Sequence, residues 1–120
     1  LDAGLPAHVV RSAVGLSGLY DLEPLMNTPS LQEVLRLTPK QVQQASPVRL
    51  PAPTHGQLLA VVGSQESGEY LRLNRAIQQA WGRERVPHAL ALPGLNHFSI
   101  VDQLTRDDTP LFQHVARALA

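Results

Sequence analysis

Glu66 and His97 are the residues of this sequence whose types best suit proton-transfer chemistry. His97 follows an apolar run and lies in the Gly-marked turn Leu92-Pro93-Gly94-Leu95-Asn96-His97. A loop histidine exchanges protons near neutral pH and serves as a general base when a second group orients it. A carboxylate such as Glu66 accepts a hydrogen bond from the imidazole, fixes its tautomer and stabilises the imidazolium. Glu69 is close enough in the sequence to leave the identity of this acid open.

Three apolar runs predict the strands that position these residues. They cover residues 9–16, 57–63 and 87–92, and the first suits a strand buried on both faces. Glu66 follows the second run and His97 follows the third. The carboxyl ends of parallel strands meet at one edge of a sheet, where ligands bind in open α/β folds. We therefore expect Glu66 and His97 to lie on one rim.

Helices are expected between and after these strands. The pattern predicts one at 30–37, one that opens at Thr38-Pro39, and longer ones at 70–82 and 111–119, with 17–24 as a loop. Tyr70 and Trp81 fall on the apolar stripe of the 70–82 helix and are expected in the core. This order predicts an α/β fold of mainly parallel strands with flanking helices, in one domain over 1–120. The outer strands are open edges, so either another chain segment completes the sheet or the protein pairs with itself.

Composition narrows the class of function. Ten basic and ten acidic residues give a formal net charge of zero, and no run of Lys or Arg indicates a nucleic-acid partner. No apolar run approaches the roughly 20 residues that span a bilayer, and the N-terminus lacks the pattern of a signal peptide. The histidines lack metal-binding spacing, and cysteine is absent. We expect a soluble, cytoplasmic protein without metal or cofactor that acts on a small molecule.

Four segments of the sequence resemble the α/β-hydrolases, in the esterase and lipase branch that includes kynurenine formamidase (arylformamidase). They occur in family order, and they are Gly15–Pro24, Ala45–Pro47, Val61–Tyr70 and Leu95–Phe98. The resemblance implies that the chain is the C-terminal part of an α/β-hydrolase fold. It also implies that Glu66 is the acid and His97 the histidine of a catalytic triad.

The same resemblance implies a substrate pocket. Its candidates are Tyr20, Asp21, Leu22 and Phe98, although Asp21 can equally cap the following turn. A small ester or amide is the implied substrate, bound together with the missing half of the fold.

The nucleophile of that family is absent from the sequence. The family places a serine on a GxSxG turn ahead of the acid, whereas here Leu19 follows Ser17-Gly18 where the pattern needs Gly. Ser17 is therefore expected at a strand end, and the half that bears the nucleophile lies outside residues 1–120. The expected function is acyl transfer from carboxylic esters or aryl formamides, with the isolated chain inactive. The alternative is a non-catalytic α/β module that binds a partner or dimerises through its sheet edges.

Overall fold

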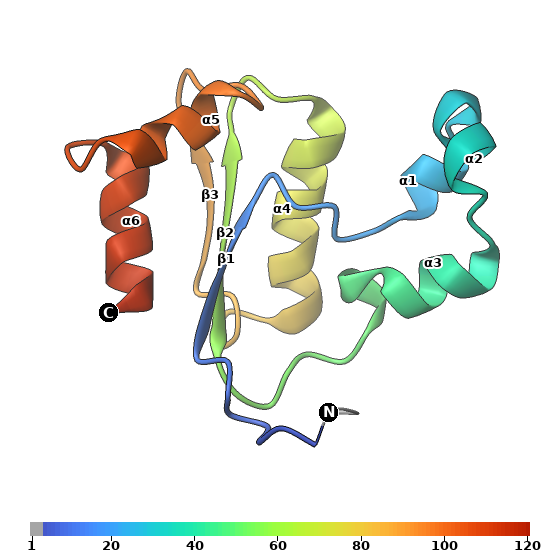
Figure 1. Ribbon diagram of the computed structural model, residues 1–120, viewed down its shortest axis with the longest axis horizontal. Coiled ribbons are helices and arrows are strands. Elements are labelled where there is room, and N and C mark those ends of the chain that lie inside the picture. The colour runs from blue at the N-terminus through green and yellow to red at the C-terminus, as the bar shows by residue number, and fades with distance from the viewer. Residues whose placement is uncertain (1–3) are drawn as a thin grey trace.

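Three parallel strands form the centre of the molecule (Figure 1). The computed structural model describes residues 4–120. The strands are β1 (Ser12–Leu16), β2 (Gln57–Gly63) and β3 (His88–Leu92), in the order β1-β2-β3. The register pairs Leu16 with Val61 and Gly63 with Leu92, so all three strands end at the same edge. The prediction of a parallel α/β sheet is confirmed.

Helices cover both faces of the sheet. They are α1 (Glu23–Met26), α2 (Pro29–Leu35), α3 (Pro39–Ala45), α4 (Gly68–Trp81), α5 (Ser99–Asp102) and α6 (Pro110–Leu119), with short 3-10 turns at Pro47–Arg49 and Gln103–Thr105. Thr38 and Gln41 form a capping box at the start of α3, and the Thr109 hydroxyl accepts the Phe112 N–H at the start of α6. These two caps lie where the Thr-Pro pairs predicted helix starts.

Two apolar clusters hold the layers together, and α4 and α6 lie on opposite sides of the sheet (Figure 1). Alternate residues of β2 point to the two faces, so Ala60 packs toward α4 while Leu59 and Val61 pack toward α6. The α4 cluster contains Tyr20, Ala60, Leu73, Ile77 and Val86, and the α6 cluster contains Leu59, Val61, Leu92, Ile100 and Leu111. Burial on both faces explains why β2 reads as a continuous apolar run.

The first strand and the short helices differ from the prediction. β1 begins at Ser12, and Val9 and Val10 are 56% and 60% exposed because they precede the strand. β1 is also an edge strand of half-buried residues, so the expectation of burial on both faces is wrong. α1 begins inside the stretch expected to be a loop, and Arg36, in the left-handed conformation, ends α2 early.

The sheet has open edges, as the sequence predicted. β1 and β3 each pair with β2 alone within residues 4–120. Pairing of these edges with a second copy or with another chain segment stays a prediction. In the described part of the chain, no helix has the length and apolarity needed to cross a membrane. A cytoplasmic location likewise stays a prediction.

Gly63 ends β2 where the loop after β3 comes closest to the sheet. A Cβ at this position would lie 2.2 Å from the Leu95 carbonyl oxygen, whereas a Cβ at Gly68 would meet nothing within 4 Å. The obstacle at Gly63 is backbone, which cannot move aside as a flexible side chain can. The carboxyl ends of β2 and β3 therefore need a glycine here.

We predict that Gly63→Ala destabilises the fold by about 1–3 kcal/mol, because the added methyl group must push the Leu95 backbone away. The matched variant Gly68→Ala, at the first position of α4, should be neutral or slightly stabilising. Urea unfolding followed by circular dichroism measures both. Equal stability of the two variants would show that the close approach at Gly63 is not a constraint.

Candidate functional site

The loop after β2 is tied to the loop after β3 by backbone hydrogen bonds. Ser64 N–H donates to the Leu92 carbonyl at 2.9 Å, and Gln65 N–H donates to the Leu95 carbonyl at 2.9 Å. Glu66 N–H then donates back to the Gly63 carbonyl at 3.0 Å, closing a tight turn. This turn places the Glu66 side chain at the carboxyl edge of the sheet.

The loop that carries His97 is built as the entry to α5. The Asn96 side-chain oxygen accepts the N–H groups of Phe98 at 2.9 Å and Ser99 at 2.8 Å, while Asn96 N–H donates to the Ser99 hydroxyl at 2.8 Å. Gly94 has φ +73°, a left-handed conformation that glycine adopts without steric cost. The sequence contained the Asn-x-x-Ser signal for this turn, and α5 was missed.

Glu66 and His97 meet at the end of these loops. His97 Nδ1 lies 2.8 Å from Glu66 Oε1, and because an ionised carboxylate only accepts, the imidazole donates. The Glu66 side chain is 0% exposed, whereas the His97 side chain is 48% exposed. Glu69 instead forms an ion pair with Arg72 on the surface of α4. Of the two candidate acids, Glu66 is therefore the one that forms a hydrogen bond with His97.

The second oxygen of Glu66 is also occupied. Ser17 Oγ–H and Gly63 N–H each donate to Glu66 Oε2 at 2.6 Å. Burial raises the pKa of Glu66, but the hydrogen bonds from Ser17, Gly63 and His97 outweigh burial and hold that pKa below its ordinary value. The carboxylate is thus kept ionised beside the imidazole. Sequence reasoning placed Ser17 at a strand end but missed its bond to the acid.

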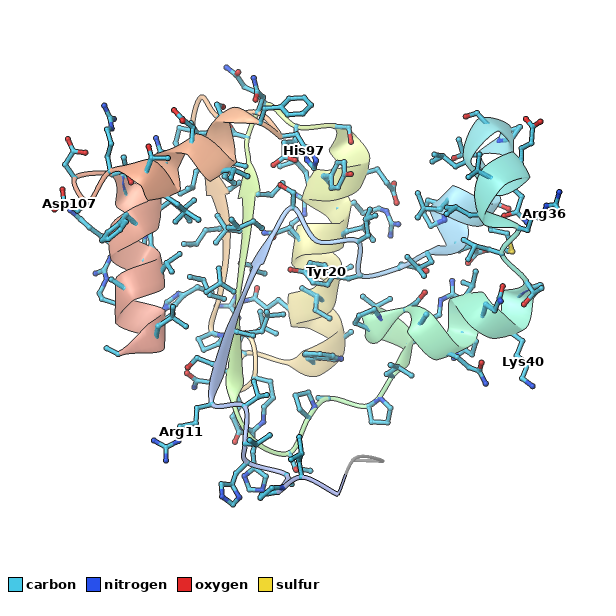
Figure 2. All side chains as sticks on the ribbon, in the orientation of Figure 1. Arg11, Tyr20, Arg36, Lys40, His97 and Asp107 are labelled. Carbon is cyan, nitrogen blue, oxygen red and sulfur yellow. The ribbon has the colours of Figure 1, made fainter. Side chains whose placement is uncertain are left out.

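Two aromatic rings flank the imidazole of His97, which lies above the carboxyl ends of the strands (Figure 2). Tyr70 lies 5.0 Å away between ring centroids, and Phe98 lies 5.6 Å away with its ring nearly perpendicular to the imidazole. Phe98 is 82% exposed, so an apolar ring stands in solvent beside the histidine. Tyr70 was expected in the core, and the structure instead places it half-buried at this site.

The other substrate-binding candidates lie apart from the pair. Tyr20 is buried in the cluster under α4 (Figure 2). Asp21 accepts the Glu23 N–H at 3.1 Å, which is the capping alternative, and its carboxylate pairs with Arg49 at 3.2 Å. Leu22 N–H donates to the Ser46 hydroxyl. No hydrogen bond joins Tyr20, Asp21 or Leu22 to His97 or Glu66 in the described structure, and their binding roles stay predictions.

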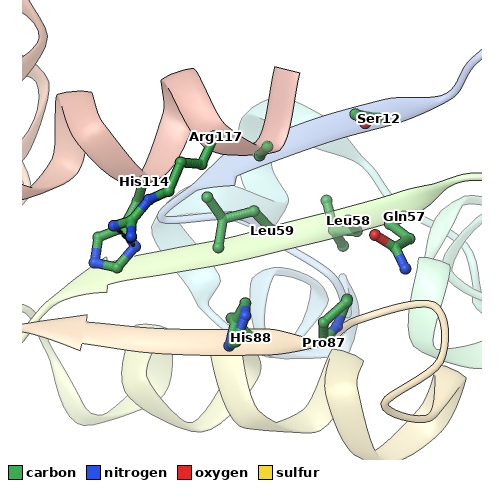
Figure 3. Close-up of a pocket in the computed structure, with 9 residues that line it drawn as sticks. Ser12, Gln57, Leu58, Leu59, Pro87, His88, His114 and Arg117 are labelled. Atoms are coloured by element: carbon green, nitrogen blue, oxygen red, sulfur yellow. Dashed lines mark hydrogen bonds between the residues drawn. The ribbon is translucent and has the colours of Figure 1, made fainter. Parts of the chain in front are cut away.

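A separate open cavity of about 380 Å³ lies at the opposite end of the sheet (Figure 3). It is bordered by the first residues of the strands, including Ser12 and His88, and by His114 and Arg117 of α6. This cavity contains neither Glu66 nor His97. Over residues 4–120, no cluster of three or more His, Cys, Asp or Glu side chains is arranged to hold a metal ion. The expectation of a protein without metal or cofactor stays a prediction.

Fold and site together define an α/β domain that holds a carboxylate–histidine pair at the carboxyl edge of a parallel sheet. No family model matches the chain, and no curated protein matches it. Among solved structures, the chain is similar to a crystal structure from Silicibacter sp. tm1040 described as a "putative thioesterase", with a TM-score of 0.80 and 24% identity. The match covers 95% of this chain and 40% of the Silicibacter chain. At this identity the likeness shows the fold alone.

These comparisons contradict the predicted family and substrate. The sequence resembled α/β-hydrolases of the esterase, lipase and kynurenine formamidase branch, whereas the similar structure is described as a thioesterase and no family model supports the assignment. The expected acyl transfer from carboxylic esters or aryl formamides is therefore wrong. The segments behind that resemblance are short, and several form the turns at the carboxyl ends of the strands, which many parallel sheets need.

The predicted catalytic triad is corrected as well. Glu66 and His97 form a pair, and the nearby hydroxyl of Ser17 donates to the carboxylate instead of to the imidazole. No hydroxyl group of residues 4–120 hydrogen-bonds the second nitrogen of His97, Nε2. The catalytic roles of Glu66 and His97 stay proposals.

We predict that Glu66→Gln makes the free energy of unfolding fall less steeply as the pH is lowered into the acid range. The lowered pKa of Glu66 means that the unfolded chain binds more protons as the pH falls. Stability from Glu66 is thus present above the ordinary glutamate value of about 4.3 and is lost as the pH falls through the folded-state pKa. Urea unfolding between about pH 7 and pH 3 measures this loss.

The matched variant is Glu69→Gln. The pKa of Glu69 is also lowered, mainly by its hydrogen bond from Arg72, but this pair is solvent-exposed and screened. Its removal should therefore change the curve little. A Glu66→Gln curve as steep as that of the unmodified protein contradicts the prediction.

Proposed function

We propose that the protein carrying this chain hydrolyses acyl thioesters, with His97 as general base and Glu66 as the group that orients it. The observation that carries the proposal is the 2.8 Å hydrogen bond between the half-exposed imidazole and a fully buried carboxylate. Such a pair holds one tautomer of histidine and stabilises its protonated form. The description of the similar Silicibacter protein supports the choice of a thioester.

The proposed chemistry follows from the free nitrogen of His97. Since Nδ1 is bonded to Glu66, Nε2 removes the proton from the attacking oxygen as that oxygen adds to the thioester carbonyl. Collapse of the tetrahedral intermediate breaks the carbon–sulfur bond, and the imidazolium returns the proton to the departing thiolate. The attacking oxygen is that of a water molecule, so the products are the free carboxylic acid and the thiol. This chain spans 40% of the Silicibacter chain, so the activity is proposed for the whole protein.

The position of Phe98 beside His97 supports a substrate with an apolar acyl group next to the reacting thioester carbonyl. Its ring is 82% exposed and 5.6 Å from the imidazole. An exposed aromatic ring beside a polar reactive group offers apolar surface that a bound acyl chain can cover. We therefore propose that Phe98 contacts the acyl chain.

We predict that His97→Ala lowers thioester hydrolysis by about 10²–10⁴-fold, the usual contribution of a general base. The assay measures thiol release from an acyl-coenzyme A with a thiol-reactive dye in the full-length protein. The matched variant His114→Ala alters a histidine at the other end of the sheet and should keep full activity. Unchanged turnover in His97→Ala would refute the proposed role.

We also predict that Phe98→Ala raises the KM for long acyl chains more than for short ones and leaves kcat nearly unchanged, because contact with the acyl chain is lost equally in substrate and transition state. Phe112, on α6, is the other phenylalanine in the sequence, and Phe112→Ala should leave KM unchanged. Steady-state kinetics over a series of acyl lengths makes the test. A KM increase that is equal for all lengths argues against acyl contact.

A further inference from the structure

Ser17 occupies an unusual place beside the proposed acid. It directly follows β1, it is buried, and it has φ +52°, a left-handed conformation that residues with a side chain rarely adopt. Its hydroxyl lies 2.6 Å from Glu66 Oε2, across 49 residues of sequence. Strained backbone of this kind persists where the surrounding structure enforces it, and it concentrates at functional sites.

The surroundings of Ser17 enforce this conformation. Ser17 N–H donates to the Val61 carbonyl at 2.8 Å, which extends the pairing of β1 with β2 by one residue. The Tyr20 side chain packs against the backbone on both sides of Ser17: a Cβ at Gly15 would lie 2.1 Å from the Tyr20 hydroxyl oxygen, and a Cβ at Gly18 would lie 2.4 Å from Cζ of the ring. The turn is therefore fixed from β2 and from the core, and its hydroxyl is held toward the carboxylate.

We propose that Ser17 is a positioning residue that fixes the Glu66 carboxylate so that one oxygen remains aimed at His97, an inference that rests on the proposed function. Oε2 accepts from Ser17 and from the Gly63 backbone, and Oε1 accepts from His97. Ser17 is the side-chain donor to Oε2 in the described structure. With both donors in place, rotation of the carboxylate breaks two hydrogen bonds, so His97 retains one orientation.

The geometry separates this role from that of a nucleophile. The Ser17 side chain is buried, and its hydrogen is directed to the carboxylate, which can only accept. A serine nucleophile gives its proton to the histidine, and no hydrogen bond joins Ser17 to His97 within residues 4–120. Ser17 therefore acts on His97 through Glu66.

Two substitutions separate the hydroxyl group from the backbone conformation. Ser17→Ala removes the hydroxyl and keeps the cost of a positive φ, whereas Ser17→Gly removes both. We expect Ser17→Gly to fold at least as well as Ser17→Ala, which keeps the test valid if the alanine variant is unstable. The matched variant Ser67→Ala removes the hydroxyl of a serine next to Glu66 that makes no side-chain cap bond.

The measurement is the titration of the Glu66 carboxylate, followed by carbon-13 NMR in protein labelled on glutamate and assigned with Glu66→Gln. Loss of a donor to the ionised form should raise the pKa of Glu66 in Ser17→Gly and Ser17→Ala but not in Ser67→Ala. If Ser17 only ended a strand, its substitution would change the stability of the protein and leave the pKa of Glu66 unchanged. An unchanged Glu66 titration in folded Ser17→Gly would overturn the inference.

A kinetic experiment links the inference to catalysis and remains separate from the NMR result. In the full-length protein, Ser17→Gly should lower kcat for thioester hydrolysis by roughly 10-fold with KM unchanged, the loss expected for one hydrogen bond to a charged group. The acid limb of its pH profile should also move to higher pH. A shifted Glu66 titration without thioesterase activity in the unmodified protein would refute the proposed function alone, whereas normal kinetics in Ser17→Gly would refute the positioning role.

Discussion

The structure depends on the buried carboxylate of Glu66, which must be supplied with hydrogen-bond donors. Glu66 has a side chain with 0% exposure, and an ionised carboxylate removed from water is costly unless hydrogen bonds replace its hydration. Three donors supply them, from the turn after β1, from the end of β2 and from the loop after β3. One charge thus ties together the carboxyl ends of all three strands. Loss of any donor leaves part of this buried charge unpaired, which costs more than the bond itself contributes.

The rest of the fold holds those donors in place. The parallel register pairs the last residues of β1 and β3, Leu16 and Leu92, with the end of β2, so the three strands end at one edge of the sheet. The apolar clusters under α4 and α6 fix the sheet from both faces. Local conformations then complete the site. Ser17 adopts a left-handed backbone under the Tyr20 ring, and Asn96 organises the turn that presents His97. Rigidity at the edge therefore comes from the core, while the imidazole of His97 remains half-exposed.

Sequence patterns predicted the parts of this arrangement that periodicity and turn chemistry control. β2, α4 and the Thr-Pro helix starts were found because apolar runs and caps are local signals, and the pairing of Glu66 with His97 followed from the geometry of parallel strands. The hydrogen bond from Ser17 to Glu66 was missed because it spans 49 residues of sequence. It also needs a positive φ at Ser17, and a serine in the sequence does not indicate that conformation as a glycine would. Tyr70 was wrongly assigned to the core, because the apolar face of a helix can cover both the core and a site at the edge of the sheet, such as that of His97. The family and substrate were wrong because short turn motifs describe the sheet edge and not the pocket.

The contrast in exposure between the two members of the pair is itself a physical argument for proton transfer. A buried carboxylate acts on the adjacent imidazole more strongly than an exposed one, because the surrounding protein screens its charge less than water does. The imidazole, in contrast, needs contact with solvent or substrate to exchange its proton, and 48% exposure provides that contact. The rings of Tyr70 and Phe98 lie beside the imidazole, at 5.0 and 5.6 Å between ring centroids. A structural ion pair requires none of these asymmetries, so their combination at one sheet edge favours a working histidine over a merely stabilising one.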